Sequence, residues 1–141
     1  MARKRKIFAF VAVLLLFLCD YLYWTVSLPL ADAFSEEMQA SVKAQLFYSD
    51  DFFVQQELAV DEEMLAAILE AVEQTEVTRR PKFGTMSQPF FRLYLYYPDG
   101  YTSMTVVENG EISADPEMTS DRRVYFDGGG ELYSMLRSLT S

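Results

Sequence analysis

The sequence contains no histidine and a single cysteine, Cys19, among its 141 residues. Without histidine the chain cannot form a Ser-His-Asp or Cys-His nucleophile, a histidine general base or most zinc sites. One cysteine excludes an intrachain disulfide. We therefore expect neither a metal nor a cofactor, and no catalytic residues of these types.

Basic residues are scarce outside the N-terminus. Four of the twelve stand together at residues 3–6, and the chain from Phe34 onward holds 19 acidic and 8 basic residues, a net charge of −11. Such a balance repels nucleic acid and anionic lipid headgroups. It excludes nucleic acid as an expected partner and leaves cations, cationic peptides or a basic protein surface open.

The long hydrophobic run begins directly after those four basic residues. It covers Ile7 to Cys19, and apolar character resumes from Tyr21 to Leu28. Roughly 20 apolar residues cross a bilayer as a helix, and basic residues before such a segment stay cytoplasmic. Residues 1–33 are therefore predicted to be a membrane anchor or a signal peptide, with the following domain extracytoplasmic.

A single-pass anchor in the cell membrane, with a cytoplasmic N-terminus, is the interpretation we favour. The cluster of Tyr21, Tyr23 and Trp24 is typical of an outer membrane interface. Asp20 would lie inside the span. Inserting a carboxylate near the bilayer centre costs on the order of 2.5–3.5 kcal/mol, and less towards the interface. The thirteen residues of the preceding apolar run can outweigh that cost.

Two other interpretations of the same segment remain open. A signal peptide would be cleaved after Ala31-Asp32-Ala33, an A-x-A sequence, and would release a secreted domain. A lipoprotein signal would use Cys19, although bulky residues precede it where small ones are needed.

The rest of the chain is predicted to form one small domain. Half of all residues are apolar and 15% are aromatic, which argues against disorder. Residues 34–41 are predicted to be a polar spacer, and residues 42–141 leave room for a single domain.

Two amphipathic helices are expected in this domain. The first begins at Asp61, a good N-cap, and the second follows the glycine run 128–130, interpreted as a flexible joint. Both have apolar residues at i, i+3, i+4 and i+7. These are Leu65, Ile68, Leu69 and Val72 in the first helix, and Leu132, Met135, Leu136 and Leu139 in the second.

The strands are expected to form an antiparallel sheet. Runs 42–48 and 52–60 predict a hairpin, and residues 90–114 predict a meander with turns at 98–100 and at Asn109-Gly110, the latter of type I′. Residues 122–126 predict a further strand. The fold class is thus α+β, with four to six strands packed by two helices.

Three tyrosines are the candidate binding residues. Strand alternation places Tyr94 and Tyr96 on the face opposite Leu93 and Leu95, near Tyr101. Exposed tyrosines on a sheet can stack on sugars or anchor a protein partner. In the alternative interpretation a helix or the first hairpin covers this face and makes it a second core layer.

The order of these elements has a familiar layout. A hairpin, a helix, a meander with Pro-Asp-Gly and Asn-Gly turns and a closing helix with Glu131-Leu132-Tyr133 stand behind a basic-apolar leader. Over about residues 42–139 the chain resembles small membrane-anchored or lipoprotein-like extracytoplasmic domains of Gram-positive Firmicutes. The resemblance implies a bacterial host and no particular activity.

Three functions are compatible with the sequence. The leading hypothesis is a non-enzymatic module that binds a protein, a peptide or a cell-wall component next to the membrane. A carboxylate-dependent hydrolase of glycans would need two acids facing one cleft about 5–10 Å apart. A structural subunit of a membrane complex would use Asp20 to meet a basic partner inside the bilayer.

Overall fold

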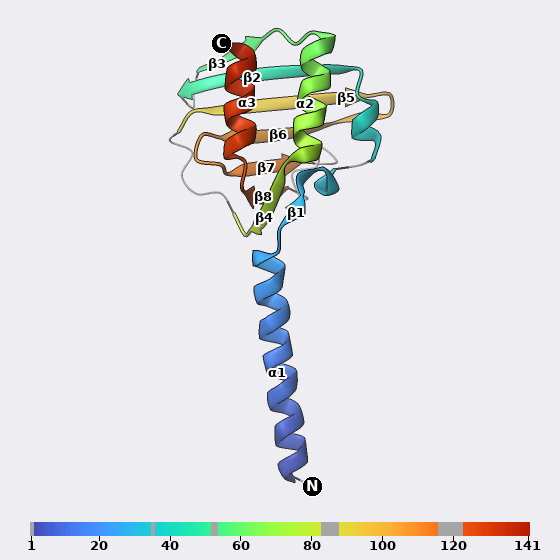
Figure 1. Ribbon diagram of the computed structural model, residues 1–141, viewed down its shortest axis with the longest axis vertical. Helices are drawn as coiled ribbons and strands as arrows, with labels where there is room; N and C mark the ends of the chain where they lie inside the picture. Colours follow the sequence, from blue (N-terminus) through green and yellow to red (C-terminus); the bar gives the residue numbers. More distant parts are fainter. Residues whose placement is uncertain (1, 35, 52–53, 83–87, 116–122) are drawn as a thin grey trace.

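A computed structural model gives the fold and describes residues 2–34, 36–51, 54–82, 88–115 and 123–141. The helix α1 (Ala2–Thr25) projects from an α+β domain (Figure 1). The strands are β1 (Leu28–Pro29), β2 (Lys43–Asp51), β3 (Val54–Leu58), β4 (Glu76–Arg80), β5 (Phe90–Tyr97), β6 (Gly100–Val107), β7 (Ile112–Asp115) and β8 (Val124–Asp127). The domain helices are α2 (Glu62–Gln74) and α3 (Gly130–Thr140), with short 3-10 helices η1 (Leu30–Ala33) and η2 (Glu36–Ala40).

The strands form one antiparallel sheet in the order β1-β4-β8-β7-β6-β5-β2-β3. The predicted α+β class is confirmed, but the sheet has eight strands where four to six were expected. The additional strands are β1 and β4. β1 is only two residues long, and β4 is rich in charged residues, so neither has a strong local strand signal. They become strands because β4 pairs with both β1 and β8, which lie far away in the sequence.

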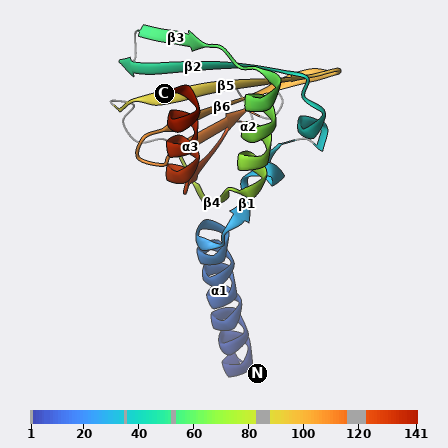
Figure 2. The ribbon, with the colours of Figure 1, turned by 45° about the horizontal axis from the view of Figure 1, so that its top comes forward.

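The two domain helices lie side by side on one face of the sheet, as Figures 1 and 2 both show. Asp61 caps α2 as predicted, because its side chain accepts a hydrogen bond of 2.8 Å from the Met64 N–H. The apolar stripes of both helices face the sheet, where Ile68 and Leu136 are fully buried against a core that includes Leu93. Fully burying a side chain of this size contributes roughly 1.5–3 kcal/mol.

The segment between α1 and β2 is part of the folded domain. Leu30, Phe34 and Met38 are buried in the core, and the Leu30 N–H donates to the Thr75 carbonyl at 2.8 Å. The prediction of a spacer at 34–41 followed by a domain from residue 42 is therefore corrected. The stretch is rich in polar residues, but Leu30, Phe34 and Met38 recur every four positions and pack into the core.

Two glycine-containing turns also differ from expectation. The hydrogen bonds Gly110 N–H to Val107 O and Val107 N–H to Glu111 O enclose three residues. This is a three-residue hairpin loop with Gly110 at φ +95°, not a two-residue type I′ turn. Gly128 and Gly129 are closely packed and do not form a loose joint, because Gly128 lies against β4 and the Gly129 N–H donates to the Gly110 carbonyl at 2.8 Å.

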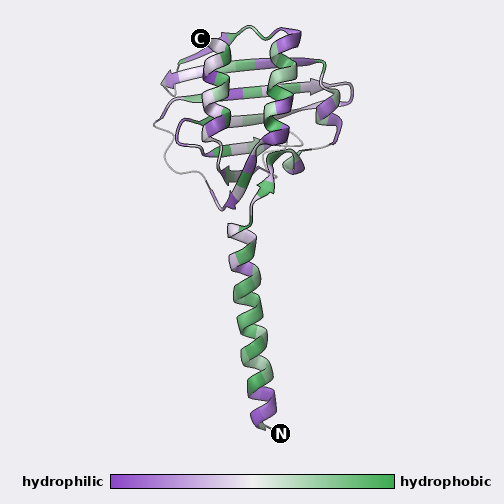
Figure 3. Cartoon of the chain, in the orientation of Figure 1, coloured by the Kyte–Doolittle hydropathy of each residue, from purple (hydrophilic) through white to green (hydrophobic). Residues whose placement is uncertain are grey.

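In the described chain, α1 is the one helix long and apolar enough to cross a membrane, with a mean hydropathy of 2.2. Figure 3 shows its apolar length between a polar N-terminal end and the domain. Its side chains are almost all exposed, and a long apolar surface left in water is unfavourable. The helix therefore has the properties of either a membrane span or a signal sequence.

Candidate binding surface on the open face of the sheet

One face of the sheet has no described helix on it, and we call it the open face. It carries the residues of β2, β5, β6 and β7 that alternate with the core residues of the same strands. Across this face the register pairs Gln45 with Tyr94, Tyr94 with Ser103 and Ser103 with Asp115. The open face is therefore defined by Lys43, Gln45, Phe47, Arg92, Tyr94, Tyr96, Tyr101, Ser103, Thr105, Ser113 and Asp115.

Two pairs of aromatic side chains form a row along the open face. Tyr96 and Tyr101 are register partners whose rings stack with centroids 5.4 Å apart. Tyr94 meets Phe47 of β2 edge-on at 5.9 Å. Such ring pairs contribute about 0.5–1.5 kcal/mol beyond the area they bury, so the row is an ordered surface.

The hydroxyl groups of this row are also ordered. The Tyr96 hydroxyl donates to Gln45 Oε1 at 2.6 Å. Burial, with the nearby Tyr101 hydroxyl as a smaller cause, raises the pKa of Tyr96 above its ordinary value, so the phenol stays protonated and able to donate. Tyr101 is the most accessible of the three tyrosines, with 38% of its surface exposed.

The predicted placement of the three tyrosines is confirmed. Leu93 and Leu95 are buried beneath the helices, and Tyr94 and Tyr96 lie on the other side of the same strand beside Tyr101. The alternative, in which a helix or the first hairpin covers the tyrosines, is wrong for the described chain. The helices α2 and α3 occupy the opposite face, and the hairpin strands β2 and β3 lie in the sheet itself beside β5. Phe47 was missed because its partners lie on β5, about 45 residues further along the chain.

A small polar cavity of about 160 Å³ lies next to the aromatic row. Its lining residues come from β5, β6, β7 and the position directly before β8. They are Arg92, Tyr94, Ser103, Thr105, Ser113, Asp115 and Arg123. Tyr94 thus belongs to both the aromatic row and the wall of the cavity.

No local sequence pattern indicates this cavity. The predicted meander ends at residue 114, whereas Asp115 is the last residue of β7, and residues 116–121 lie outside the described part. The Thr102 hydroxyl donates to the Asp115 carbonyl at 3.0 Å and fixes this strand end. Only the pairing of β7 with β6 and of β6 with β5 brings Asp115 and Arg92 to one place.

Comparison with known proteins adds nothing to this geometry. The chain matches no protein-family model, no curated protein and no solved structure. The resemblance to Firmicute extracytoplasmic domains therefore stays a prediction, and the argument about function depends on the residues themselves.

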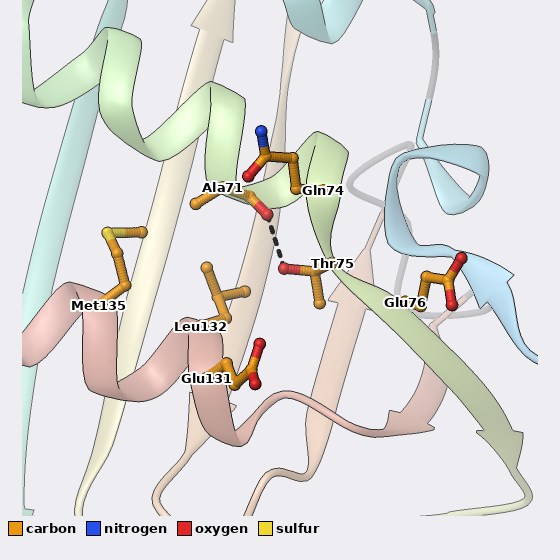
Figure 4. Close-up of a pocket in the computed structure, with 7 residues that line it drawn as sticks. All are labelled: Ala71, Gln74, Thr75, Glu76, Glu131, Leu132 and Met135. Carbon is orange, nitrogen blue, oxygen red and sulfur yellow. Dashed lines mark hydrogen bonds between the residues drawn. The ribbon is translucent and has the colours of Figure 1, made fainter.

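A second cavity, of about 470 Å³, lies between the end of α2 and the start of α3 (Figure 4). Glu76 and Glu131 are its two acids, and both are exposed. Glu76 accepts a hydrogen bond from the Ser27 hydroxyl at 3.1 Å, and the Thr75 hydroxyl donates to the Ala71 carbonyl at 2.6 Å. A glycosidase needs a partly desolvated general acid, and these exposed side chains do not provide that environment.

The base of the domain meets the end of α1. The Arg79 guanidinium lies 4.4 Å from the centre of the Tyr23 ring and donates to the Tyr23 carbonyl at 3.3 Å. Trp24 packs edge-on against Tyr23 at 4.9 Å, and both rings line a cavity of about 210 Å³ together with Arg79. Asp20 is exposed about one turn before Tyr23, on the side of α1 that leads away from the domain. The aromatic cluster predicted for the membrane interface is thus joined to the domain through Arg79.

Proposed function

We propose that this protein is a non-enzymatic, membrane-anchored binding module, and that the open face of its sheet is the surface that meets a protein, a peptide or a cell-wall component. The observation that carries the proposal is the ordered aromatic row on a sheet face without a described helix. A sheet covered by helices on one side only is stable. On the other side Tyr101 is 38% exposed and Tyr94 and Tyr96 are half-buried, so the aromatic part of the open face is accessible to a partner.

Charge on the open face differs from that of the whole domain. The net charge of −11 after residue 33 favours cationic partners, yet Lys43, Arg92 and Arg123 lie on or beside the open face. Since Asp115 lies among them, the face combines both signs of charge. A partner for this face needs mixed polar chemistry beside an apolar strip, and a simple polycation does not supply it.

The anchor is proposed to remain attached and to span the membrane once, with its N-terminus cytoplasmic. Cleavage after Ala33 would remove Leu28 and Pro29, which pair with β4, and Leu30, which is fully buried. Removing a buried leucine side chain typically costs about 2–5 kcal/mol. A released domain would therefore be less stable than the intact one, which supports the anchor over the signal peptide.

Photo-crosslinking in the native membrane tests the open face. p-Benzoylphenylalanine in place of Tyr101 reports contacts of that face, and the same residue in place of Ser134, exposed on α3, reports contacts of the helical face. We expect a defined adduct from position 101 and none from position 134. Equal adducts from both positions, or an adduct from position 134 alone, would refute the open face as the binding surface.

N-terminal sequencing of the protein isolated from that membrane tests the anchor. A chain that begins at Met1 or Ala2 is expected. A chain that begins at Phe34 would show that the leader is removed and would overturn the membrane-anchored part of the proposal, while the crosslinking result would still decide the role of the open face.

A further inference from the structure

The polar cavity beside the aromatic row contains a buried carboxyl oxygen without a hydrogen-bond partner. Asp115 has 6% of its surface exposed, and its Oδ1 atom has no hydrogen-bond partner among the described residues. Nearly all buried polar atoms in proteins are hydrogen-bonded, and an unpaired one destabilises the fold. A donor from outside the chain would satisfy this oxygen.

Two arginines line the same cavity. Arg92 is half-buried and Arg123 is exposed at the rim. Within the described part of the chain neither forms an ion pair, whereas Arg80 nearby is paired with Glu111 at 3.1 Å and Asp127 at 2.7 Å. A guanidinium presents a planar fork of donors that fits a carboxylate.

Asp115 forms no direct ion pair with Arg92 or Arg123, so each of these side chains can still accept a charged group of a ligand. A metal ion or a simple cation would meet two guanidinium groups, and a simple anion would meet the Asp115 carboxylate. A neutral sugar would leave all three charges without a counter-charge. The ligand that complements the cavity carries both charges itself.

From this arrangement we infer that the cavity binds a small zwitterion of the amino-acid class, with its ammonium group at Asp115 and its carboxylate at Arg92 and Arg123. The hydroxyl groups of Ser103 and Ser113 line the site as further polar partners. A volume of about 160 Å³ is well below the roughly 300–1,000 Å³ of sites for drug-sized ligands. The cavity therefore suits one small amino acid or a very short peptide with both ends free.

This inference deepens the proposed function, because it rests on the open face being a binding surface. Tyr94 joins the cavity wall to the aromatic row, so a side chain or a second residue of the ligand would extend over Tyr94 towards Phe47. The chemistry is that of amino acids and peptides, in line with a peptide-binding role.

Equilibrium dialysis of the full chain in detergent micelles against radiolabelled alanine tests the inference, with unlabelled analogues as competitors. Alaninamide keeps only the ammonium group and N-acetylalanine keeps only the carboxylate. We expect alanine to bind and each single-charge analogue to compete at least about tenfold more weakly. Dialanine distinguishes the sources: stronger competition than alanine assigns the site to a peptide, and weaker competition assigns it to a free amino acid.

Two outcomes of this series would overturn the inference. One is the absence of alanine and dialanine binding at concentrations up to about 10 mM, which would leave the cavity to water. The other is an analogue with one charge that competes as well as alanine, which would make the site a simple anion or cation site. Neither outcome changes the crosslinking from position 101, so a failure here is distinguishable from a failure of the proposed function.

Matched variants test which side chains bind the two charged groups of the ligand. Asp115→Asn and Arg92→Gln are each expected to weaken alanine binding at least about tenfold. The controls Asp99→Asn, in an exposed turn, and Arg137→Gln, on the helical face, are expected to leave it unchanged. Unchanged binding in Asp115→Asn would refute the assignment of the ammonium site, and the analogue series decides the result should that variant fail to fold.

Discussion

Replacing Gly128 by alanine tests the packing of β8 onto the base of the sheet. Gly128 has φ +106°, a conformation that is strained by about 1–3 kcal/mol for other residues. A Cβ atom at this position would lie 2.9 Å from the Glu76 carbonyl oxygen and 3.3 Å from the Val77 Cα. Both contacts are with the backbone of β4, which pairs with β1 and β8 and cannot move freely.

Strain and contact together predict a loss of about 2–4 kcal/mol in the free energy of unfolding. The free energy of unfolding of a domain of this size is about 5–15 kcal/mol, so the variant should still fold but have a melting temperature lower by roughly 10–20 °C. The assay is thermal and urea unfolding of the full chain in detergent, followed by near-UV circular dichroism. That signal reports the packed tyrosines of the domain and not the helicity of α1.

Gly130→Ala provides the matched control two residues away. Gly130 opens α3, has no positive φ, and no atom lies within 4 Å of a Cβ built there. Alanine is the better helix former by up to about 1 kcal/mol, so this variant should be as stable as the wild type or slightly more stable. Equal stability of Gly128→Ala and the wild type, or equal losses in both variants, would refute the reasoning from φ and backbone contact.

Three further predictions concern stability. The hydrogen bond from the Tyr48 hydroxyl to Asp50 and, second, burial raise the pKa of Tyr48 in the folded state. The contribution of Tyr48 to the free energy of unfolding is therefore complete below about pH 10 and declines at higher pH. In urea unfolding, Tyr48→Phe should lose stability less steeply with alkaline pH than the wild type, and an equally steep loss would contradict this. Asp61→Ala removes the α2 cap and should cost about 1 kcal/mol, with faster hydrogen exchange in the first helical turn; unchanged exchange there would refute the cap. Ile68→Ala, at a fully buried site, should cost about 2–5 kcal/mol in the same unfolding assay, whereas Glu70→Ala on the exposed side of α2 should stay within about 0.5 kcal/mol of the wild type.

The elements that the sequence predicted well are those specified by neighbouring residues. The helix α2 has its cap, its acidic first turn and its apolar stripe within 14 residues, so its signal is local. The meander of β5, β6 and β7 is likewise formed by strands that follow one another through short turns. The same alternation correctly placed Tyr94 and Tyr96 opposite Leu93.

The elements that the sequence missed depend on distant partners. β4 contains mostly polar and charged residues, and it is a strand because β1 and β8 supply its hydrogen bonds. Residues 30–38 were interpreted as part of a leader and a spacer, since only the folded sheet offers the apolar surface that covers Leu30, Phe34 and Met38.

The candidate site divides in the same way. A period of two along one strand is enough to place Tyr94 and Tyr96 on one face, whereas the contact of Tyr94 with Phe47 depends on the pairing of β5 with β2. The cavity needed the register of three strands, because Arg92, Ser103 and Asp115 come together only through pairings that no local pattern encodes. The N-terminal segment combines a local and a tertiary contribution. Hydropathy alone makes residues 1–33 a candidate membrane span. Only tertiary packing decided that the chain from Leu28 onward belongs to the domain, because burial is a property of the whole fold and not of the segment.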